Sequence, residues 1–165
     1  MPTPIHIRRA GPEDTNTITV FNLAMAQETE HRRLDEATLR DGVRSLLGQP
    51  QYGFYIVAEQ AGENQKQAIG QLMITYEWSD WRNGVFWWIQ SVYVIPEQRG
   101  RGVYQAMHRH ITAEAKNDPR ICGIRLYVAR ENERAHAAYR SVGLLPSAYA
   151  MYEQDFVLGP HAVEL

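Results

Sequence analysis

The sequence has 165 residues, of which 44% are hydrophobic and 22% charged, a composition that excludes a disordered, collagen-like or fibrous chain. The length suits one domain spanning residues 1–165, with a real core. A net charge of -2 and an isoelectric point near 6.3 argue against a dedicated nucleic-acid partner, which would need clustered Lys and Arg. No apolar run approaches the roughly 20 residues that span a bilayer, and residues 1–9 lack a secretory layout. We therefore expect a cytoplasmic protein with no membrane partner.

In chain order, the first half of the sequence predicts a strand, two helices and a β-hairpin. Pro12, Glu13 and Asp14 are typical of a helix start, where proline is tolerated and acidic groups favour the helix dipole. The predicted elements are a strand at residues 5–9, a helix from 11 to about 26, a helix at 35–47, and strands at 54–59 and 68–76 joined by a turn at 61–64.

The second half predicts a strand, helix, strand, helix and strand. Residues 85–94 form a nearly unbroken aromatic and β-branched run, which indicates an interior strand ended by Pro96. A helix at 103–116 and a strand at 124–128 complete a right-handed parallel crossover. A further helix begins at Asn132 and ends near Gly143, and residues 149–156 read as a last strand. The fold class is α+β on a mixed sheet.

The loop at residues 96–103 is predicted to bind an anion. Gly100 and Gly102 allow consecutive backbone N–H groups to point outward at the start of a helix, and Arg99 and Arg101 add positive charge. A solvated turn is the alternative for a Gly-x-Gly pair taken alone. A dinucleotide-binding oxidoreductase is excluded, because Gln105 stands where the third glycine of that fingerprint would be.

A second motif covers residues 126–144. Asn132 fits a helix N-cap, and Ala135, Ala138, Tyr139 and Val142 share one apolar helix face. Taken alone, this pattern describes a core helix.

Together the two motifs resemble the GNAT superfamily of N-acetyltransferases. Residues 92–102 are similar to its acetyl-CoA signature, Arg/Gln-x-x-Gly-x-Gly/Ala after a strand, with Tyr104 in place of the final small residue, and residues 126–144 follow its second signature closely. The resemblance implies a mixed, mostly antiparallel sheet of six to seven strands flanked by about four helices. It also implies acetyl-CoA as co-substrate and transfer of its acetyl group to an amine.

The resemblance also assigns roles to residues. It makes Tyr139 the acid toward the departing CoA sulfur, a role that a well-placed phenol can fill. The residues that it places against acetyl-CoA are Val92, Tyr93, Val94, Arg99, Gly100, Arg101, Gly102, Val103, Tyr104 and Asn132.

Gln90 stands where many such enzymes carry a Glu that accepts the proton of the amine. An amide can orient a substrate or a water but is no useful base, and a structural amide is an equal alternative. Carboxylates and aromatic rings elsewhere could favour a cationic amine, although such charged patches are usually solvated faces. The residues we consider for acceptor binding are Glu28, His31, Glu77 and Trp88, with Glu30 and Asp80 as further proton acceptors.

The acceptor itself stays open. Much of the chain resembles the diamine (spermidine/spermine) acetyltransferase branch, but amino acids, aminoglycosides and peptide N-termini are alternatives to a polyamine. A non-catalytic domain that binds acyl-CoA or a protein partner is the rival interpretation, suggested by Gln90 and Tyr104. The number of aromatic residues makes a homodimer plausible.

We predict no metal site. His108 and His110 are two residues apart on a helix and face different sides, and the one cysteine, Cys122, has no second cysteine to pair with. We interpret Cys122 as a small core residue in a reducing compartment rather than as a nucleophile.

Overall fold

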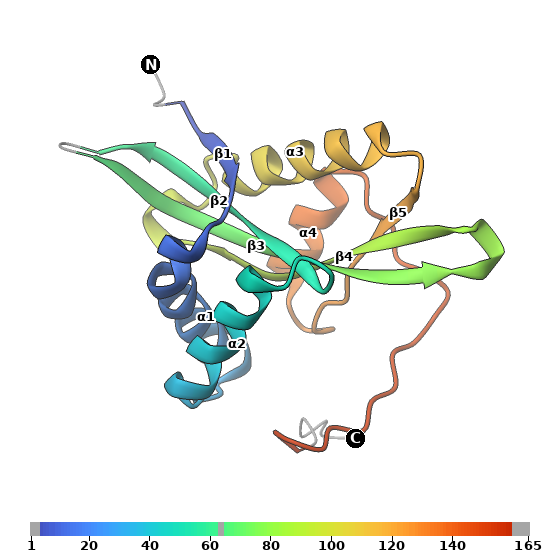
Figure 1. The fold of residues 1–165 in the computed structure, drawn as a ribbon, viewed down its shortest axis with the longest axis horizontal. Coiled ribbons are helices and arrows are strands. Elements are labelled where there is room, and N and C mark those ends of the chain that lie inside the picture. Colours follow the sequence, from blue (N-terminus) through green and yellow to red (C-terminus); the bar gives the residue numbers. More distant parts are fainter. Residues whose placement is uncertain (1–3, 63–64, 160–165) are drawn as a thin grey trace.

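The computed structural model describes residues 4–62 and 65–159, and its centre is a five-stranded sheet (Figure 1). The strands are β1 (His6–Arg9), β2 (Gly53–Ala61), β3 (Lys66–Ser79), β4 (Gly84–Val94) and β5 (Ile121–Arg125), in that spatial order. The first four pair antiparallel, and β5 runs parallel to β4. The mixed, mostly antiparallel sheet is thus confirmed, with five strands among the described residues instead of six to seven.

Four α-helices cover the two faces of the sheet (Figure 1). Helices α1 (Thr15–Glu30) and α2 (Glu36–Gly48) pack on one face, around Ile18, Val43 and Tyr55. Helices α3 (Val103–Asn117) and α4 (Glu133–Ser141) lie on the other face. Short 3-10 turns at Pro12–Asp14, Asp80–Arg82 and Pro96–Gln98 complete the described helical segments.

The larger core lies between the sheet and α3. Val103, Met107 and Ile111 occur every fourth residue of α3, so they share one helix face, and all three are buried against the sheet. Trp87 and Ile89 of β4 face the same core. This packing fixes the start of α3 against the end of β4, where the predicted anion-binding loop lies.

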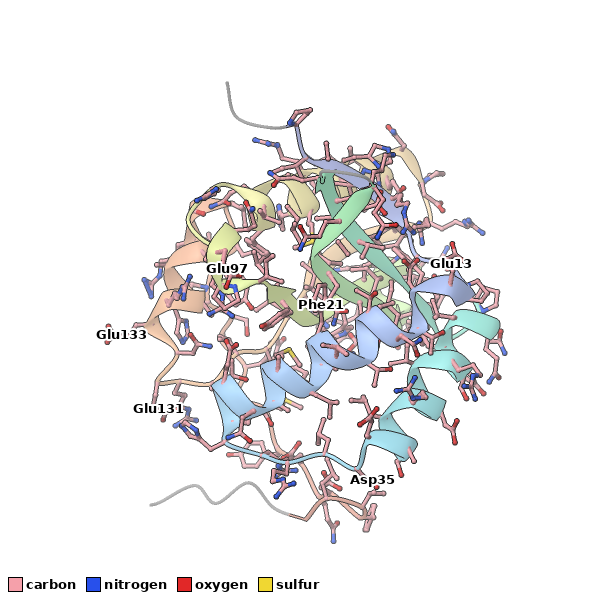
Figure 2. All side chains as sticks on the ribbon, turned by 90° about the vertical axis from the view of Figure 1, so that its left-hand side faces the viewer. Glu13, Phe21, Asp35, Glu97, Glu131 and Glu133 are labelled. Atoms are coloured by element: carbon pink, nitrogen blue, oxygen red, sulfur yellow. The ribbon has the colours of Figure 1, made fainter. Side chains whose placement is uncertain are left out.

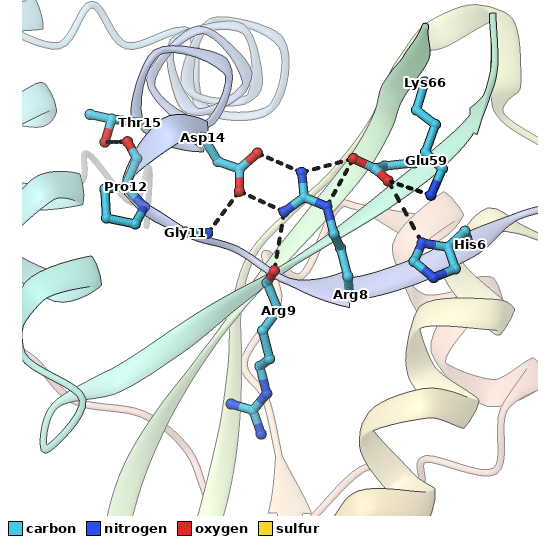
Figure 3. A network of polar contacts seen from close by, with 9 residues as sticks. All are labelled: His6, Arg8, Arg9, Gly11, Pro12, Asp14, Thr15, Glu59 and Lys66. Carbon is cyan, nitrogen blue, oxygen red and sulfur yellow. Dashed lines mark hydrogen bonds and ion pairs between the residues drawn. The ribbon is translucent and has the colours of Figure 1, made fainter.

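The start of α1 is tied to the sheet by Arg8 (Figure 3). The guanidinium donates to both carboxylate oxygens of Asp14 at 2.8 Å and to Glu59 of β2 at 2.9 Å. Burial acts to raise the pKa of Asp14, but the bonds from Arg8, the bond from the Gly11 N–H and the charge of Arg8 together hold that pKa below its usual range. Asp14 therefore remains charged, and the bonds of Arg8 to Asp14 and Glu59 fix where α1 leaves the sheet.

Two predicted strands differ from the structure at the far edge of the sheet. The strand predicted at 124–128 begins earlier, as β5 at Ile121, and ends at Arg125, so residues 126–128 are not a strand. The strand predicted at 149–156 is absent, and this stretch has no regular structure. Among residues 4–62 and 65–159 β5 pairs with β4 alone, so neither stretch has a strand partner.

Candidate acetyl-CoA site

A β-bulge opens the sheet where the site lies. Gln71 pairs with Tyr93 and Met73 with Gln90, so Leu72 of β3 faces two residues of β4, and Ser91 takes a left-handed φ of 50°. The pairing of β4 with β5 ends just before this bulge, at Trp88 and Arg125. The far half of β4 therefore diverges from β5 and leaves a gap in the sheet.

Buried polar groups hold the bulge in place. The Gln71 amide donates to Asn22 of α1 at 2.8 Å and to the Ser91 carbonyl at 3.3 Å, and Asn22 in turn donates to the Tyr55 hydroxyl at 3.4 Å. Asn22 and Gln71 are both buried. Because a buried amide is costly to leave without hydrogen bonds, this network holds α1 relative to the opening in the sheet.

The glycine loop follows β4 directly. Gly100 and Gly102 have φ values of 73° and 80°, which favour glycine, and a Cβ at either would meet nothing within 4 Å. Gly102 is the N-cap of α3 and supplies no side-chain acceptor, so the first N–H groups of this helix face the loop. A helix start with open space before it suits a phosphate.

The gap and the loop form one cavity of about 650 Å³. It lies between the second half of α1, the end of β4, the loop, α3 and α4. Its lining includes the predicted residues Val92, Tyr93, Val94, Arg99, Gly100, Gly102, Val103, Tyr104, Asn132, Tyr139 and Glu28. Arg101 is exposed and does not line it.

Tyr139 of α4 meets Tyr104 of α3 on one wall of the cavity. The two rings are 5.5 Å apart in an edge-to-face arrangement. Burial raises the pKa of Tyr139 above its usual range. Burial raises the pKa of Tyr104 as well, with a smaller contribution from Tyr139. Tyr139 is therefore a neutral phenol at physiological pH. Its ring packs against Tyr104, the residue that departs from the acetyl-CoA signature.

Arg99 lines the cavity, and its side chain is only 24% exposed. Its Nε donates to the Val94 carbonyl at 2.7 Å, and its Nη2 lies 2.5 Å from a carboxylate oxygen of Glu28. The Tyr93 hydroxyl donates to the other oxygen of Glu28 at 3.1 Å. Glu28, which we predicted to bind the acceptor, therefore forms one cluster with Tyr93 and Arg99, which we predicted to bind acetyl-CoA.

The family follows from comparison with known proteins. Residues 18–144 match the model of the Acetyltransferase (GNAT) family. The chain belongs to the GNAT family. A possible acetyltransferase from Clostridium difficile 630 is 42% identical with a TM-score of 0.84, over 93% of this chain and 98% of that one. The protein is thus an acetyl-CoA-dependent N-acetyltransferase.

Two more distant structures share the GNAT fold. A predicted acetyltransferase from Clostridium acetobutylicum, solved with acetyl-CoA, has a TM-score of 0.72 at 18% identity, over 92% of this chain and 96% of that one. AAC(6')-Iy, solved with a bisubstrate analogue, has a TM-score of 0.70 at 15% identity, over 93% of this chain and 99% of that one. No curated protein sequence gives a significant match.

The remaining residues predicted for this GNAT enzyme lie outside the cavity. Gln90 donates to the Thr75 hydroxyl at 2.6 Å on the face of the sheet that carries α1. Glu77 accepts from the Trp88 indole at 2.9 Å and from Arg125 at 2.6 Å, so its charge is compensated. His31 is exposed at the C-cap of α1. Glu77 and Trp88 are therefore together, but apart from Glu28.

Several cavity residues were not predicted from the sequence. Asn132 caps α4 by accepting from the Ala135 N–H at 3.1 Å, which places the first turn of α4 at the cavity. Arg134 lies in that turn. A positive charge beside a helix start is the feature of the sequence that could have indicated Arg134 as a cavity residue. The unpredicted lining residues are Met25, Thr29, Gln98, Gln105, Ala129, Glu131, Arg134, Ala135 and Ala138.

Cys122 lies half-buried on β5. His108 is buried in α3, where burial lowers its pKa, whereas His110 contacts Glu114 at 3.2 Å. Within residues 4–62 and 65–159, no three His, Cys, Asp or Glu side chains are grouped to hold a metal ion. Nor is any helix of these ranges long and apolar enough to cross a membrane.

Proposed function

We propose that this enzyme transfers the acetyl group of acetyl-CoA to a primary amine by direct attack, with Tyr139 as the general acid. The observation that carries this proposal is a neutral, half-buried phenol on the wall of a cavity that also contains the glycine loop. The amine nitrogen bonds to the thioester carbonyl carbon, the carbon–sulfur bond breaks, and the departing sulfur takes the phenolic proton. Solvent then returns a proton to Tyr139 and accepts the one that the amine loses.

The cavity suits acetyl-CoA as substrate. The open backbone at Gly100 and Gly102 faces the start of α3 and would receive the pyrophosphate, with Arg99 and Arg134 as nearby positive charges. Residues Val92 to Val94 border the gap between β4 and β5, where the pantetheine arm would pair with the strand. Val103, Tyr104 and Asn132 complete these proposed contacts, and Arg101 would meet only the outer phosphates, since it is exposed.

For the acceptor we propose a small cationic amine, with a polyamine as the first candidate. Gln90, Thr75 and Trp88 line the sheet face below α1, and Glu28 lies where α1 meets the cavity. Gln90 would orient the amine or a water. His31 and Glu77 would contact more distant parts of a long acceptor. AAC(6')-Iy, which shares the fold, was solved with an acetylneamine analogue, so aminoglycosides belong among the acceptors to test.

The test is a CoA-release assay with polyamines, amino acids, aminoglycosides and short peptides, run on the wild type and on Tyr139→Phe. The variant keeps the ring and its contact with Tyr104 but loses the proton. We expect kcat to fall about 10²-fold or more, the usual effect of a lost general acid, while acetyl-CoA still binds. Unchanged turnover in Tyr139→Phe would remove the assigned role. We also propose a cytoplasmic location and a homodimer.

A further inference from the structure

Helix α4, which carries Tyr139, is attached to the fold by partly buried residues. It has nine residues, and none of them is buried. A helix shorter than about 12–15 residues is only marginally stable by itself, so the position of α4 depends on its packing. Ala138, Tyr139 and Val142 pack, partly buried, against the main core. The direction of the Tyr139 side chain therefore depends on the groups that contact its ring.

Hydrogen bonds hold the backbone of Tyr139 but not its phenol. The Tyr139 carbonyl accepts from the N–H groups of Val142 at 3.2 Å and Leu144 at 3.1 Å, at the end of α4. Within residues 4–62 and 65–159, no hydrogen bond to the hydroxyl contributes to the pKa of Tyr139, which burial alone raises. The orientation of the phenol in the cavity is therefore set by ring packing.

Tyr104 supplies this packing from a rigid part of the fold. Its ring meets that of Tyr139 edge-to-face with the centroids 5.5 Å apart, an arrangement that aromatic pairs favour. Tyr104 is only 8% exposed and belongs to the same core cluster as Met107 and Ile111, which anchor α3. The His108 ring, 6.0 Å away, also lies beside it. Tyr104 is thus a fixed surface for a phenol on a half-buried helix.

This contact belongs to this chain rather than to the GNAT signature. The signature has glycine or alanine at the position of Tyr104, and neither has a side chain long enough to reach Tyr139. The Tyr104 hydroxyl is buried and has no hydrogen-bond partner in the described part of the chain. In the free enzyme, the contribution of Tyr104 therefore comes from its ring.

We propose that Tyr104 is a positioning residue that orients the phenol of Tyr139 toward the thioester. A general acid must lie within hydrogen-bond reach of the atom that takes its proton, so a ring that turns away loses its effect. The energy of an aromatic pair favours one ring orientation about two- to tenfold over others. The effect on rate rests on the proposed function of Tyr139, whereas the restraint on its ring does not.

The first test compares Tyr104→Phe with Tyr104→Leu. Both lack the hydroxyl, so any contact that it makes with acetyl-CoA is lost equally, but only Phe keeps an aromatic ring. NMR relaxation of isotope-labelled tyrosine rings should show the Tyr139 ring as rigid in the wild type and Tyr104→Phe, and as more mobile in Tyr104→Leu. Tyr104→Met is a second variant without a ring and should behave like Tyr104→Leu.

The control for loosening of α3 is Ile111→Val, which removes a buried methyl group about two turns further along the helix. Urea unfolding and acetyl-CoA binding check that each variant is folded. The Tyr139 ring should stay rigid in Ile111→Val. A ring that stays as rigid in both Tyr104→Leu and Tyr104→Met, or that becomes as mobile in Ile111→Val, would overturn the inference.

The second test measures kcat with acetyl-CoA and spermidine, or with whichever acceptor of the panel the wild type acetylates fastest. Tyr104→Leu should have a kcat about two- to tenfold below that of Tyr104→Phe. In a Tyr139→Phe background this difference should disappear, because no phenolic proton remains to be oriented. A difference that persists there, or none with Tyr139 present, would refute the positioning role. Unchanged turnover in Tyr139→Phe alone would instead refute the acid itself, and the positioning role with it.

Discussion

Replacing Glu28 with Gln should tighten the binding of acetyl-CoA. In the structure Arg99 is held by Glu28 and by the Val94 carbonyl, whereas the proposed pyrophosphate site needs this guanidinium at the glycine loop. Binding therefore has to break the contact with Glu28. Gln keeps the size and one acceptor oxygen but removes the charge, so Arg99 is easier to draw away.

The magnitude follows from the exposure of the pair. The side chains of Arg99 and Glu28 are 24% and 38% exposed, and an ion pair so accessible to solvent contributes about 1 kcal/mol at most. Since 1.36 kcal/mol corresponds to a tenfold change, Glu28→Gln should lower the Kd for acetyl-CoA by up to about fivefold. Calorimetric titration with acetyl-CoA at low salt measures this change, and higher ionic strength should reduce it.

Glu131→Gln is the matched control. Glu131 lines the same cavity and lies beside the start of α4 (Figure 2), but it is not the carboxylate that pairs with Arg99. Both variants change the net charge by the same amount, so a general electrostatic effect would appear in both. An unchanged or higher Kd in Glu28→Gln, or an equal gain in Glu131→Gln, would refute the idea that Glu28 restrains Arg99.

Three further predictions concern the framework and the pH dependence. Asn22→Ala removes the partner that the buried Gln71 amide has at 2.8 Å, so the free energy of unfolding measured in urea should fall by about 1–3 kcal/mol. The control is Gln27→Ala at an exposed position, where the loss should be less than about 0.5 kcal/mol. Burial lowers the pKa of His108, so the unfolded chain binds more protons. Stability should therefore fall as the pH decreases from about 6.5 through the folded pKa. This slope should be smaller in His108→Gln than in His136→Gln, because His136 is less buried than His108. Burial raises the pKa of Tyr139, and Gln90 cannot accept a proton, so the pKa of the amine should control the rise of kcat/KM with pH. We expect kcat/KM to show no decrease until the pH exceeds about 10. A falling limb near pH 8 would assign the acid to another group.

The sequence predicted the parts of the site that depend on local chemistry. Gly100 and Gly102 have the positive φ values that a glycine loop at a helix start needs, and Asn132 accepts the capping bond of α4. Such features depend on a few consecutive residues, so spacing alone indicates them. The family resemblance joined the two motifs, and the cavity brings Tyr139 and the loop together.

Features set by contacts between distant residues were not predictable from the sequence. The position of the Arg99 guanidinium depends on Glu28, which is 71 positions away in the sequence. Glu28 reaches Arg99 only because α1 crosses the end of β4. The bulge at Ser91 has no glycine to indicate it and depends on Asn22 and Gln71. The strand predicted at 149–156 was wrong. Tyr149, Tyr152 and Phe156 favour strands, but a strand also needs a neighbouring edge, which a sequence pattern does not supply.

The placement of carboxylates explains how acetyl-CoA and the amine could be coupled. Glu77 is compensated by Arg125, and Gln90 is an uncharged amide, so neither offers a free negative charge on the sheet face. Glu28 differs because its partner, Arg99, is itself an anion-binding group at the cavity. If the pyrophosphate draws Arg99 to the loop, as proposed, Glu28 loses its ionic partner and keeps the bond from Tyr93 at the cavity. For the proposed cationic acceptor this counter-charge would be available only after acetyl-CoA has bound, so we expect acetyl-CoA to bind before the acceptor.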